Sequence, residues 1–260
     1  MYAKVKILLV FFLAIFINPG FAQAPLQSPE QFLGYKLGTR FTRHSDLVRY
    51  LEYLSQQAPG RMKLQTYGTT YEGRPLFLAA ITSEGSINRL EEFRTDNLKR
   101  TGLLSGQPSP NQPAIVWLSY NVHGNEAVSS EAVLQVLYDL LNPANERTQS
   151  WLKNTVILID PCVNPDGRER YVHWYSQMAN ATPNADPWAR EHQEPWPGGR
   201  FNHYLFDLNR DLAWQTQQES QQRIAVYNQW LPQLHADFHE MSGEASYYFS
   251  PAAKPFRTAC

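Results

Sequence analysis

Residues 114–141, AIVWLSYNVHGNEAVSSEAVLQVLYDLL, join an apolar segment to a segment with helical periodicity. Ala114–Tyr120 is almost entirely apolar, which is typical of a strand that is covered on both faces. From Ala127 to Leu141 the apolar residues recur at the spacing of one helix face. The stretch therefore predicts a buried strand followed by a helix, with the polar run His123–Glu126 in the connection between them.

Strands and helices alternate in the same way on both sides of this stretch. We expect further strands at Met62–Tyr67, Pro75–Thr82, Thr155–Asp160 and Leu234–His239, and a short extended piece at Tyr247–Ser250. We expect helices at Ser45–Gln57, with Ser45 as its N-cap, and at Ser86–Lys99, Arg168–Met178 and Thr216–Trp230. This alternation predicts an α/β fold with an open, mostly parallel mixed sheet and helices on both faces.

Composition narrows the possible functions before any motif is considered. The 260 residues include 23 Lys plus Arg and 24 Asp plus Glu, a net charge of −1, so the chain has no electrostatic footprint for nucleic acid. Hydrophobic residues make up 43%, enough for the core of one α/β domain. The 2 cysteines exclude a multi-cysteine zinc cluster, so a metal would need His and carboxylate ligands. Cys162 and Cys260 could pair, although a buried free thiol at Cys162 is the simpler interpretation.

The N-terminus has the pattern of an export signal. Met1–Lys6 is basic, Ile7–Ile17 is an apolar run, and Ala22-Gln23-Ala24 supplies small residues at a cleavage position. The apolar run is too short to span a bilayer of about 30 Å, which favours a cleaved signal peptide over residues 1–24 against an uncleaved anchor. We expect a secreted or periplasmic protein, with residues 25–40 as an N-terminal extension and no membrane attachment after cleavage.

Possible metal ligands lie at two of the predicted strand ends. His123 and Glu126 follow the strand Ala114–Tyr120 at its carboxyl end, where open α/β sheets bind ligands. Zn²⁺ accepts such nitrogen and oxygen donors. The alternative is a loop histidine beside a glutamate that only favours the helix N-terminus.

The segment Leu234–His239 alternates, which places His235, Asp237 and His239 on one face of the strand. His239 lies last, nearest the carboxyl edge of the sheet, and is therefore the better ligand candidate. His235 is interpreted as structural. Glu240 and Glu244 are further oxygen donors nearby, or else solvated side chains.

A third polar run, Asp207-Leu208-Asn209-Arg210, suits two tasks. Asp207 could accept the second N–H of a metal-bound histidine. Asn209 and Arg210 could hold a carboxylate, since a guanidinium binds it in bidentate fashion. The alternative is a surface turn with an exposed ion pair.

Five motifs together resemble the zinc carboxypeptidases of the carboxypeptidase A/B type. They occur in the order of that family between residues 41 and 251. They are the hairpin Tyr67–Pro75, the H-x-x-E pair in His123–Glu126, the N-P-D-G turn Asn164–Gly167, the D-x-N-R run Asp207–Arg210 and the D-x-H run Asp237–His239. Such a combination is far more specific than any one of its parts.

The resemblance implies a metal site with one Zn²⁺ ion. His123, Glu126 and His239 would bind this ion, the two-histidine, one-glutamate ligand set of carboxypeptidase A. Asp207 would support His123 through a hydrogen bond. Residues 41–260 would then form the catalytic domain.

For the substrate, the resemblance implies a peptide or protein with a free C-terminus. Asn209 and Arg210 would hold the terminal carboxylate. An upstream arginine would polarise the scissile carbonyl, and we assign this task to Arg200, which precedes Asn209 by nine residues in the same loop. Arg190 is the alternative, because the family's spacing at this point is longer.

Two residues of the family pattern have no match in the sequence. The general-base glutamate and the tyrosine that covers the substrate carboxylate lie farther beyond the third ligand than Cys260 does. Tyr247 and Tyr248 are too close to His239 for that tyrosine, and Glu240 and Glu244 are not suited to the base. We therefore expect an N-terminal portion of the enzyme, with an incomplete catalytic domain and little activity by itself.

The predicted function is hydrolysis of the C-terminal peptide bond of peptides by a zinc-activated water molecule. A zinc-dependent deacylase of N-acyl amino acids is an alternative, since related enzymes share the ligand triad. A secreted carboxylate-binding or peptide-binding module without catalysis is another. A structural α/β protein without a metal is the least compatible with the motifs.

Overall fold

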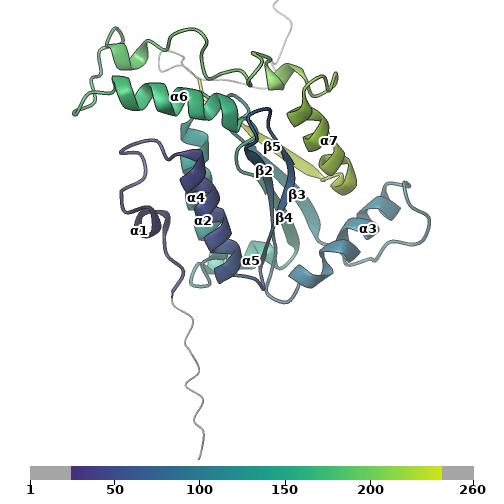
Figure 1. The fold of residues 1–260 in the computed structure, drawn as a ribbon. Coiled ribbons are helices and arrows are strands. Elements are labelled where there is room, and N and C mark those ends of the chain that lie inside the picture. Colours follow the sequence, from purple (N-terminus) through teal and green to yellow (C-terminus); the bar gives the residue numbers. More distant parts are fainter. Residues whose placement is uncertain (1–24, 242–260) are drawn as a thin grey trace, which may run out of the picture.

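The computed structural model describes residues 25–241 (Figure 1). The predicted signal peptide, the extended piece Tyr247–Ser250, Glu244 and Cys260 lie outside the described residues. Within residues 25–241, no helix is long and apolar enough to cross a membrane. Cys162 is buried and forms no disulfide bond with another of the described residues.

A mixed sheet of five strands forms the centre of the fold. The strands stand in the order β1 (Met62–Thr69), β2 (Pro75–Ile81), β4 (Thr155–Asp160), β3 (Ala114–Tyr120) and β5 (Leu234–Phe238). β2 pairs antiparallel with β1 and β4, whereas β3 pairs parallel with β4 and β5. β2 therefore runs against the other strands, and the mostly parallel mixed sheet predicted from the sequence is confirmed.

Helices cover both faces of this sheet, as Figure 1 shows. One face carries α2 (His44–Gln57) and α4 (Val128–Leu141), and the other carries α3 (Leu90–Arg100) and α7 (Gln218–Trp230). A further long helix, α6 (Pro165–Met178), contacts α2. The short helices are α1 (Pro29–Leu33), η1 (Ile87–Arg89), α5 (Glu146–Leu152), η2 (Arg190–His192) and η3 (Leu208–Arg210).

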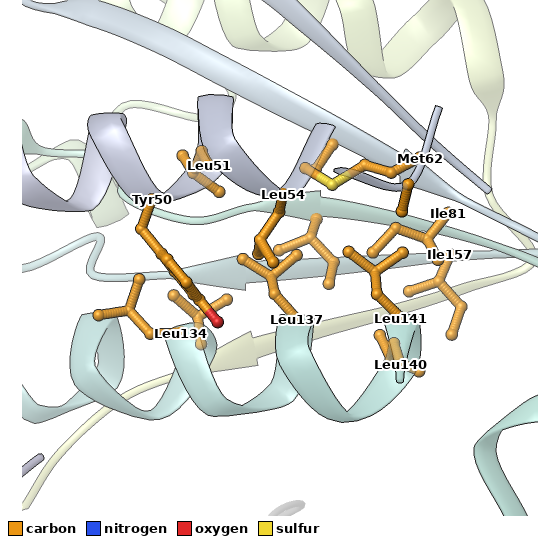
Figure 2. Packing of buried hydrophobic residues seen from close by; sticks show 14 of the residues in the cluster. Tyr50, Leu51, Leu54, Met62, Ile81, Leu134, Leu137, Leu140, Leu141 and Ile157 are labelled. Carbon is orange, nitrogen blue, oxygen red and sulfur yellow. The ribbon is translucent and has the colours of Figure 1, made fainter. Parts of the chain in front are cut away.

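Successive residues of the strands supply two separate cores. In β2, Ala79 and Ile81 pack with α2 and α4, in the cluster that Figure 2 shows from close by. Leu78 and Ala80 pack on the opposite face with α3 and α7. Side chains of a strand alternate between faces, so a strand buried on both sides needs apolar residues at every position. This explains why the strand segments are continuous apolar runs in the sequence.

Tertiary contacts move some boundaries away from the sequence predictions. The prediction of Ser45 as an N-cap was wrong, because α2 begins at His44 with Arg43 as the N-cap and without a side-chain cap. The amide of His44 donates instead to Oε1 of Glu169 in α6 at 2.5 Å, a partner that the local sequence does not reveal. β5 ends just before His239, which therefore follows the strand.

The N-P-D-G run opens a helix. Asn164 is the N-cap of α6 and accepts a hydrogen bond from the amide of Gly167, and Pro165 occupies the first helical position. α6 therefore begins three residues before the predicted Arg168. The short helices α1 and α5 were not predicted, although the Ser28–Gln31 capping box at α1 is a sequence signal.

Candidate metal centre and carboxylate-binding site

The carboxyl ends of β3 and β5 bring the candidate ligands together. The two strands are parallel neighbours, and Tyr120 pairs with Phe238 at the end of their ladder. The two rings stack with their centroids 4.4 Å apart. Because parallel strands end at the same edge of a sheet, the residues that follow them meet there. The imidazole rings of His123 and His239 lie with centroids 4.8 Å apart.

Three side chains converge at this edge. Nδ1 of His123 lies 2.7 Å from Oε1 of Glu126, and Nδ1 of His239 lies 2.9 Å from Oε2 of the same carboxylate. Ligand atoms of the three residues all lie within 4.8 Å of one another. Two ring nitrogens and one carboxylate are a donor set that Zn²⁺ accepts in hydrolytic enzymes, so the residues present fit a zinc ion.

The second nitrogen of each imidazole meets another carboxylate. Nε2 of His123 lies 3.2 Å from Oδ1 of Asp207, and Nε2 of His239 lies 3.1 Å from Oδ2 of Asp237. Such a carboxylate keeps the proton on Nε2 and leaves the Nδ1 lone pair free for a metal. The contact of Asp237 was missed in the sequence, although the strand alternation places it on the same face as His239.

Burial and hydrogen bonding act in opposite directions on two of these carboxylates. Burial raises the pKa of Glu126, but hydrogen bonds and charge from His123 outweigh it, and the pKa lies below its usual value. At Asp207 burial is likewise outweighed, here chiefly by the hydrogen bonds from Arg200, so its pKa is also lowered. Both groups are therefore anionic at neutral pH, as a metal ligand and a hydrogen-bond acceptor for imidazole must be.

Asn121 holds the loop that carries the first two ligands. Its backbone has a φ of 58°, in the left-handed region that asparagine tolerates better than most residues. Its buried side-chain amide donates to the carbonyls of His123 at 2.6 Å and Glu126 at 3.0 Å. Its carbonyl oxygen accepts from the hydroxyl of Ser130 at 3.0 Å. The two ligand positions are thus linked through one side chain before any metal binds.

Gly124, Gly167 and Gly199 form a glycine junction, at which two loops and the first turn of α6 approach one another backbone to backbone. A Cβ atom on Gly124 would lie 2.2 Å from the amide nitrogen of Arg168 and 2.4 Å from the carbonyl oxygen of Gly199. A Cβ atom on Gly167 would lie 2.3 Å from that same carbonyl oxygen. No side chain fits at these positions without a backbone shift. The junction seats the loop before Arg200 against the ligand loop.

A buried brace of Thr42, Glu131 and Arg168 lies under the first turn of α4. Arg168 and Glu131 form an ion pair of 2.8 Å, with their side chains 0% and 6% exposed. Arg168 also donates to the carbonyls of Ala127 and Thr42, each at 2.8 Å. Glu131 accepts from the amide and the hydroxyl of Thr42. Since Ala127 directly follows Glu126, the brace fixes the backbone beside a ligand.

His44 lies close enough to this brace to be affected by its charge. Both of its ring nitrogens are buried without a hydrogen-bond partner in the described part of the chain. Burial first, and then the charge of Arg168, lower the pKa of His44 from 6.5 to about 3. The imidazole is therefore neutral in the folded protein at physiological pH.

Asp207 connects the metal centre to the two predicted arginines. Its Oδ1 accepts from the amide of Asn209 at 2.9 Å in addition to His123, and its Oδ2 pairs with Nη2 of Arg200 at 2.9 Å. The Arg200 side chain is 38% exposed. Arg210 is exposed, and its Nη1 donates to the carbonyl of Asn209. The guanidinium of Arg200 thus contacts the histidine–carboxylate cluster, and that of Arg210, three residues after Asp207, is open to solvent.

The remaining candidates take other roles. Arg190 belongs to η2, where its Nε donates to the carbonyl of Met178, and it makes no contact with Asp207. His235 hydrogen-bonds to Ser119 at 3.0 Å within the sheet, which suits a structural histidine. Glu240 accepts from two backbone amides at the start of α4 and is not among the three converging ligands.

Comparison with known proteins points to one family. The family model for zinc carboxypeptidases matches residues 47–255. The human carboxypeptidase N catalytic chain is 29% identical over 179 residues, which cover 66% of this chain and 31% of the human protein. Carboxypeptidase E of Caenorhabditis elegans is 27% identical over 193 residues, covering 70% of this chain and 33% of that protein. The chain thus spans about a third of the length of these relatives.

Solved structures agree at the level of the fold. The metallo-carboxypeptidase from Burkholderia cenocepacia aligns with a TM-score of 0.51 and 15% sequence identity, covering 76% of this chain and 41% of that one. At this identity the likeness shows the fold alone. The family match, by contrast, extends over most of the sequence and includes all three converging ligand residues. On that match, the chain belongs to the zinc carboxypeptidase family.

Proposed function

We propose that this chain carries the metal-binding and carboxylate-binding parts of a zinc-dependent metallocarboxypeptidase, with one Zn²⁺ ion held by His123, Glu126 and His239. The observation that supports this most is the convergence of two Nδ1 atoms on the single carboxylate of Glu126. Both imidazoles present the same nitrogen and hold the other one against a carboxylate. A metal site requires such an arrangement of its histidines, whereas a structural ion pair does not.

The proposed substrate is a peptide with a free C-terminus. The guanidinium of Arg210 is exposed and is positioned by Asn209, so both can bind a planar carboxylate. Arg200 pairs with Asp207, the carboxylate that also contacts His123 and the amide of Asn209. We assign to it the stabilisation of the charge that develops on the scissile carbonyl oxygen.

When bound, zinc would acidify a water molecule and polarise the carbonyl group of the substrate. Side chains of the protein orient the groups that this chemistry needs. Asp207 keeps a proton on Nε2 of His123 and at the same time orients Arg200. The hydrogen bond from Arg200 stabilises the anionic form of Asp207. One carboxylate thus couples the orientation of a metal ligand to that of the substrate-facing arginine.

Proton transfer is assigned to a carboxylate outside residues 25–241. Within that range, Glu126 is one of the three proposed zinc ligands. Glu240 accepts hydrogen bonds from the first backbone amides of α4. Glu194 accepts from Asn125 and from the amide of Gly199. These acids are engaged in holding the loops. Little hydrolysis is therefore expected from the sequence 25–241 by itself.

We further propose that the protein is exported and that residues 1–24 are removed. The support is the basic start, the apolar run and the small residues before Pro25. N-terminal sequencing of the mature protein should begin at Pro25. A mature protein that still begins at Met1 would contradict this part of the proposal.

Peptides with free and with amidated C-termini test the function. The full-length protein that includes residues 25–241 should contain one zinc ion and cleave only the free acids. Arg210→Ala should lower kcat/KM for free acids by about 10–100-fold, because charge-assisted hydrogen bonds are lost. Arg190→Ala is the matched control, since this arginine lies in another segment, and it should behave as the unmodified protein. Equal cleavage of amides, or turnover of N-acyl amino acids alone, would overturn the assignment.

A further inference from the structure

Glu240 contacts the first turn of helix α4 from the far end of the chain. Its Oε1 accepts hydrogen bonds from the amides of Val128 at 2.7 Å and Ser129 at 3.3 Å. The residues so joined are about 110 positions apart in sequence, and Glu240 follows β5 whereas α4 follows β3. The contact therefore bridges the two segments that carry the candidate metal ligands.

The first turn of α4 needs such a partner. The initial amides of a helix have no acceptor within the helix and are normally satisfied by an N-cap side chain. The N-cap of α4 is Ala127, which has no polar side chain. A carboxylate is also the favoured group at this end of the helix dipole. Glu240 thus supplies a cap that the local sequence lacks.

The position of the cap matters for the metal site. Glu126 precedes the capped turn, and His239 directly precedes Glu240. The ladder between β3 and β5 ends at Tyr120 and Phe238, so the backbone of His239 lies beyond the last strand pair. Beyond that ladder the side chain of His239 contacts Glu126 and Asp237, and the Glu240 cap follows at the next residue.

We propose that Glu240 is a positioning residue that holds His239 opposite Glu126 and thereby sets the affinity of the site for Zn²⁺. This inference rests on the proposed zinc site. Glu240 itself is not in the converging ligand group of His123, Glu126 and His239, and its Oε1 accepts from the helix amides. The cap acts by holding the segment with His239 against the segment with Glu126 before the ion binds.

Zinc affinity measured by chelator competition tests this role in the purified protein. Glu240→Ala should weaken zinc binding by about tenfold, the lower end of the effect of residues that support metal ligands. Glu240→Gln keeps an oxygen acceptor and should stay within about threefold of the unmodified protein. The visible spectrum of bound Co²⁺ should change in Glu240→Ala and be restored in Glu240→Gln.

Asn145→Ala is the matched control for loss of a helix cap. The side chain of Asn145 caps α5 by accepting from the amide of Thr148, in a helix that carries no ligand. This variant should lose a similar amount of thermal stability in EDTA but bind zinc normally. If Glu240→Ala does not fold, Glu240→Asp replaces it, since the shortened side chain reaches the amides poorly and should also weaken zinc binding.

The outcomes separate the two proposals. If Glu240→Ala binds zinc as the unmodified protein does while His123→Ala does not, the positioning role is wrong and the zinc site stands. If Asn145→Ala weakens zinc binding as much as Glu240→Ala, the effect is one of general stability and the positioning role is again wrong. If the unmodified protein binds no zinc, both proposals are overturned.

Discussion

The two halves of the candidate metal centre are built very differently. His123 and Glu126 lie in a loop that is tied by Asn121, seated by the glycine junction and supported by the buried brace. His239 follows β5, an edge strand of the described sheet, just beyond the last residue pair of its ladder. The side chain of His123 is 5% exposed, whereas that of His239 is 31% exposed.

The difference suggests separate tasks: the half with His123 and Glu126 is formed by folding, and the half with His239 completes the site. The first half is formed by contacts that belong to folding, so two ligands stand ready without a metal. The second half depends on one ladder end, on Asp237 and on the Glu240 cap. We expect damage to the first half to appear as lost stability. Damage to the second half should appear as weaker metal binding with the fold intact.

The largest effect is expected from the buried brace. Arg168→Met leaves the carboxylate of Glu131 buried without its cation, which costs about 3–5 kcal/mol in comparable pairs. Urea unfolding should show this loss of stability both with and without zinc. Arg43→Met is the control, because Arg43 is 40% exposed and its ion pair with Glu169 spans 3.6 Å. It should change stability by less than about 1 kcal/mol. Equal effects of the two variants would remove the distinction between the halves.

Acidification should weaken the first half through His44. Its pKa is about 3 when folded and near 6.5 when unfolded, so the unfolded chain binds the proton more tightly. The stability that neutral His44 contributes is present above pH 6.5 and is lost as the pH falls towards 3. Between pH 7 and pH 5 the loss should be about 2 kcal/mol.

His44→Phe should remove that part of the pH dependence. The measurement is the free energy of unfolding in EDTA at several pH values for both proteins. The difference between them isolates His44 from the other titrating groups. Parallel curves for the two proteins would show that His44 is not held neutral by the fold.

The last comparison concerns the zinc affinities that the two supporting carboxylates, Asp207 and Asp237, help to set, and the expected losses differ by about tenfold. Asp207→Asn acts on the buried His123, which has little freedom to adapt, and should lower zinc affinity by about 100-fold. Asp237→Asn acts on the more exposed His239 and should lower it by about tenfold. Chelator competition at constant pH measures both. A reversed order would mean that the edge-strand half governs binding.

Much of the fold could be predicted because it depends on local patterns. The apolar run Ala114–Tyr120 and the helical spacing of Ala127–Leu141 correspond closely to β3 and α4. The parallel order of strand ends then places His123 and His239 at one edge, which follows from general rules of α/β sheets. These inferences need only periodicity and the position of strand ends.

Contacts between distant segments could not be predicted in this way. Glu240 reaches α4, and Arg168 reaches Thr42 across more than 120 residues. The start of α2 depends on Glu169, which explains the failure of the Ser45 prediction. No local pattern signals such partners, because each residue type is common on surfaces as well. Strand alternation places Asp237 on the same face as His239, but by itself it does not show that the two side chains form a hydrogen bond.

The glycine junction has a consequence for redesigning substrate preference. Residues 179–197 form a long connection. Trp188, near the middle of this segment and here called its tip, is 84% exposed, and Trp196, close to its end, is 81% exposed. Its return to the site is anchored by the backbone at Gly199, next to Arg200. A graft from a relative can therefore vary the tip in length and composition while the anchoring glycine stays in place. Changing any one of the three glycines alone would shift the arginine and the first two metal ligands together.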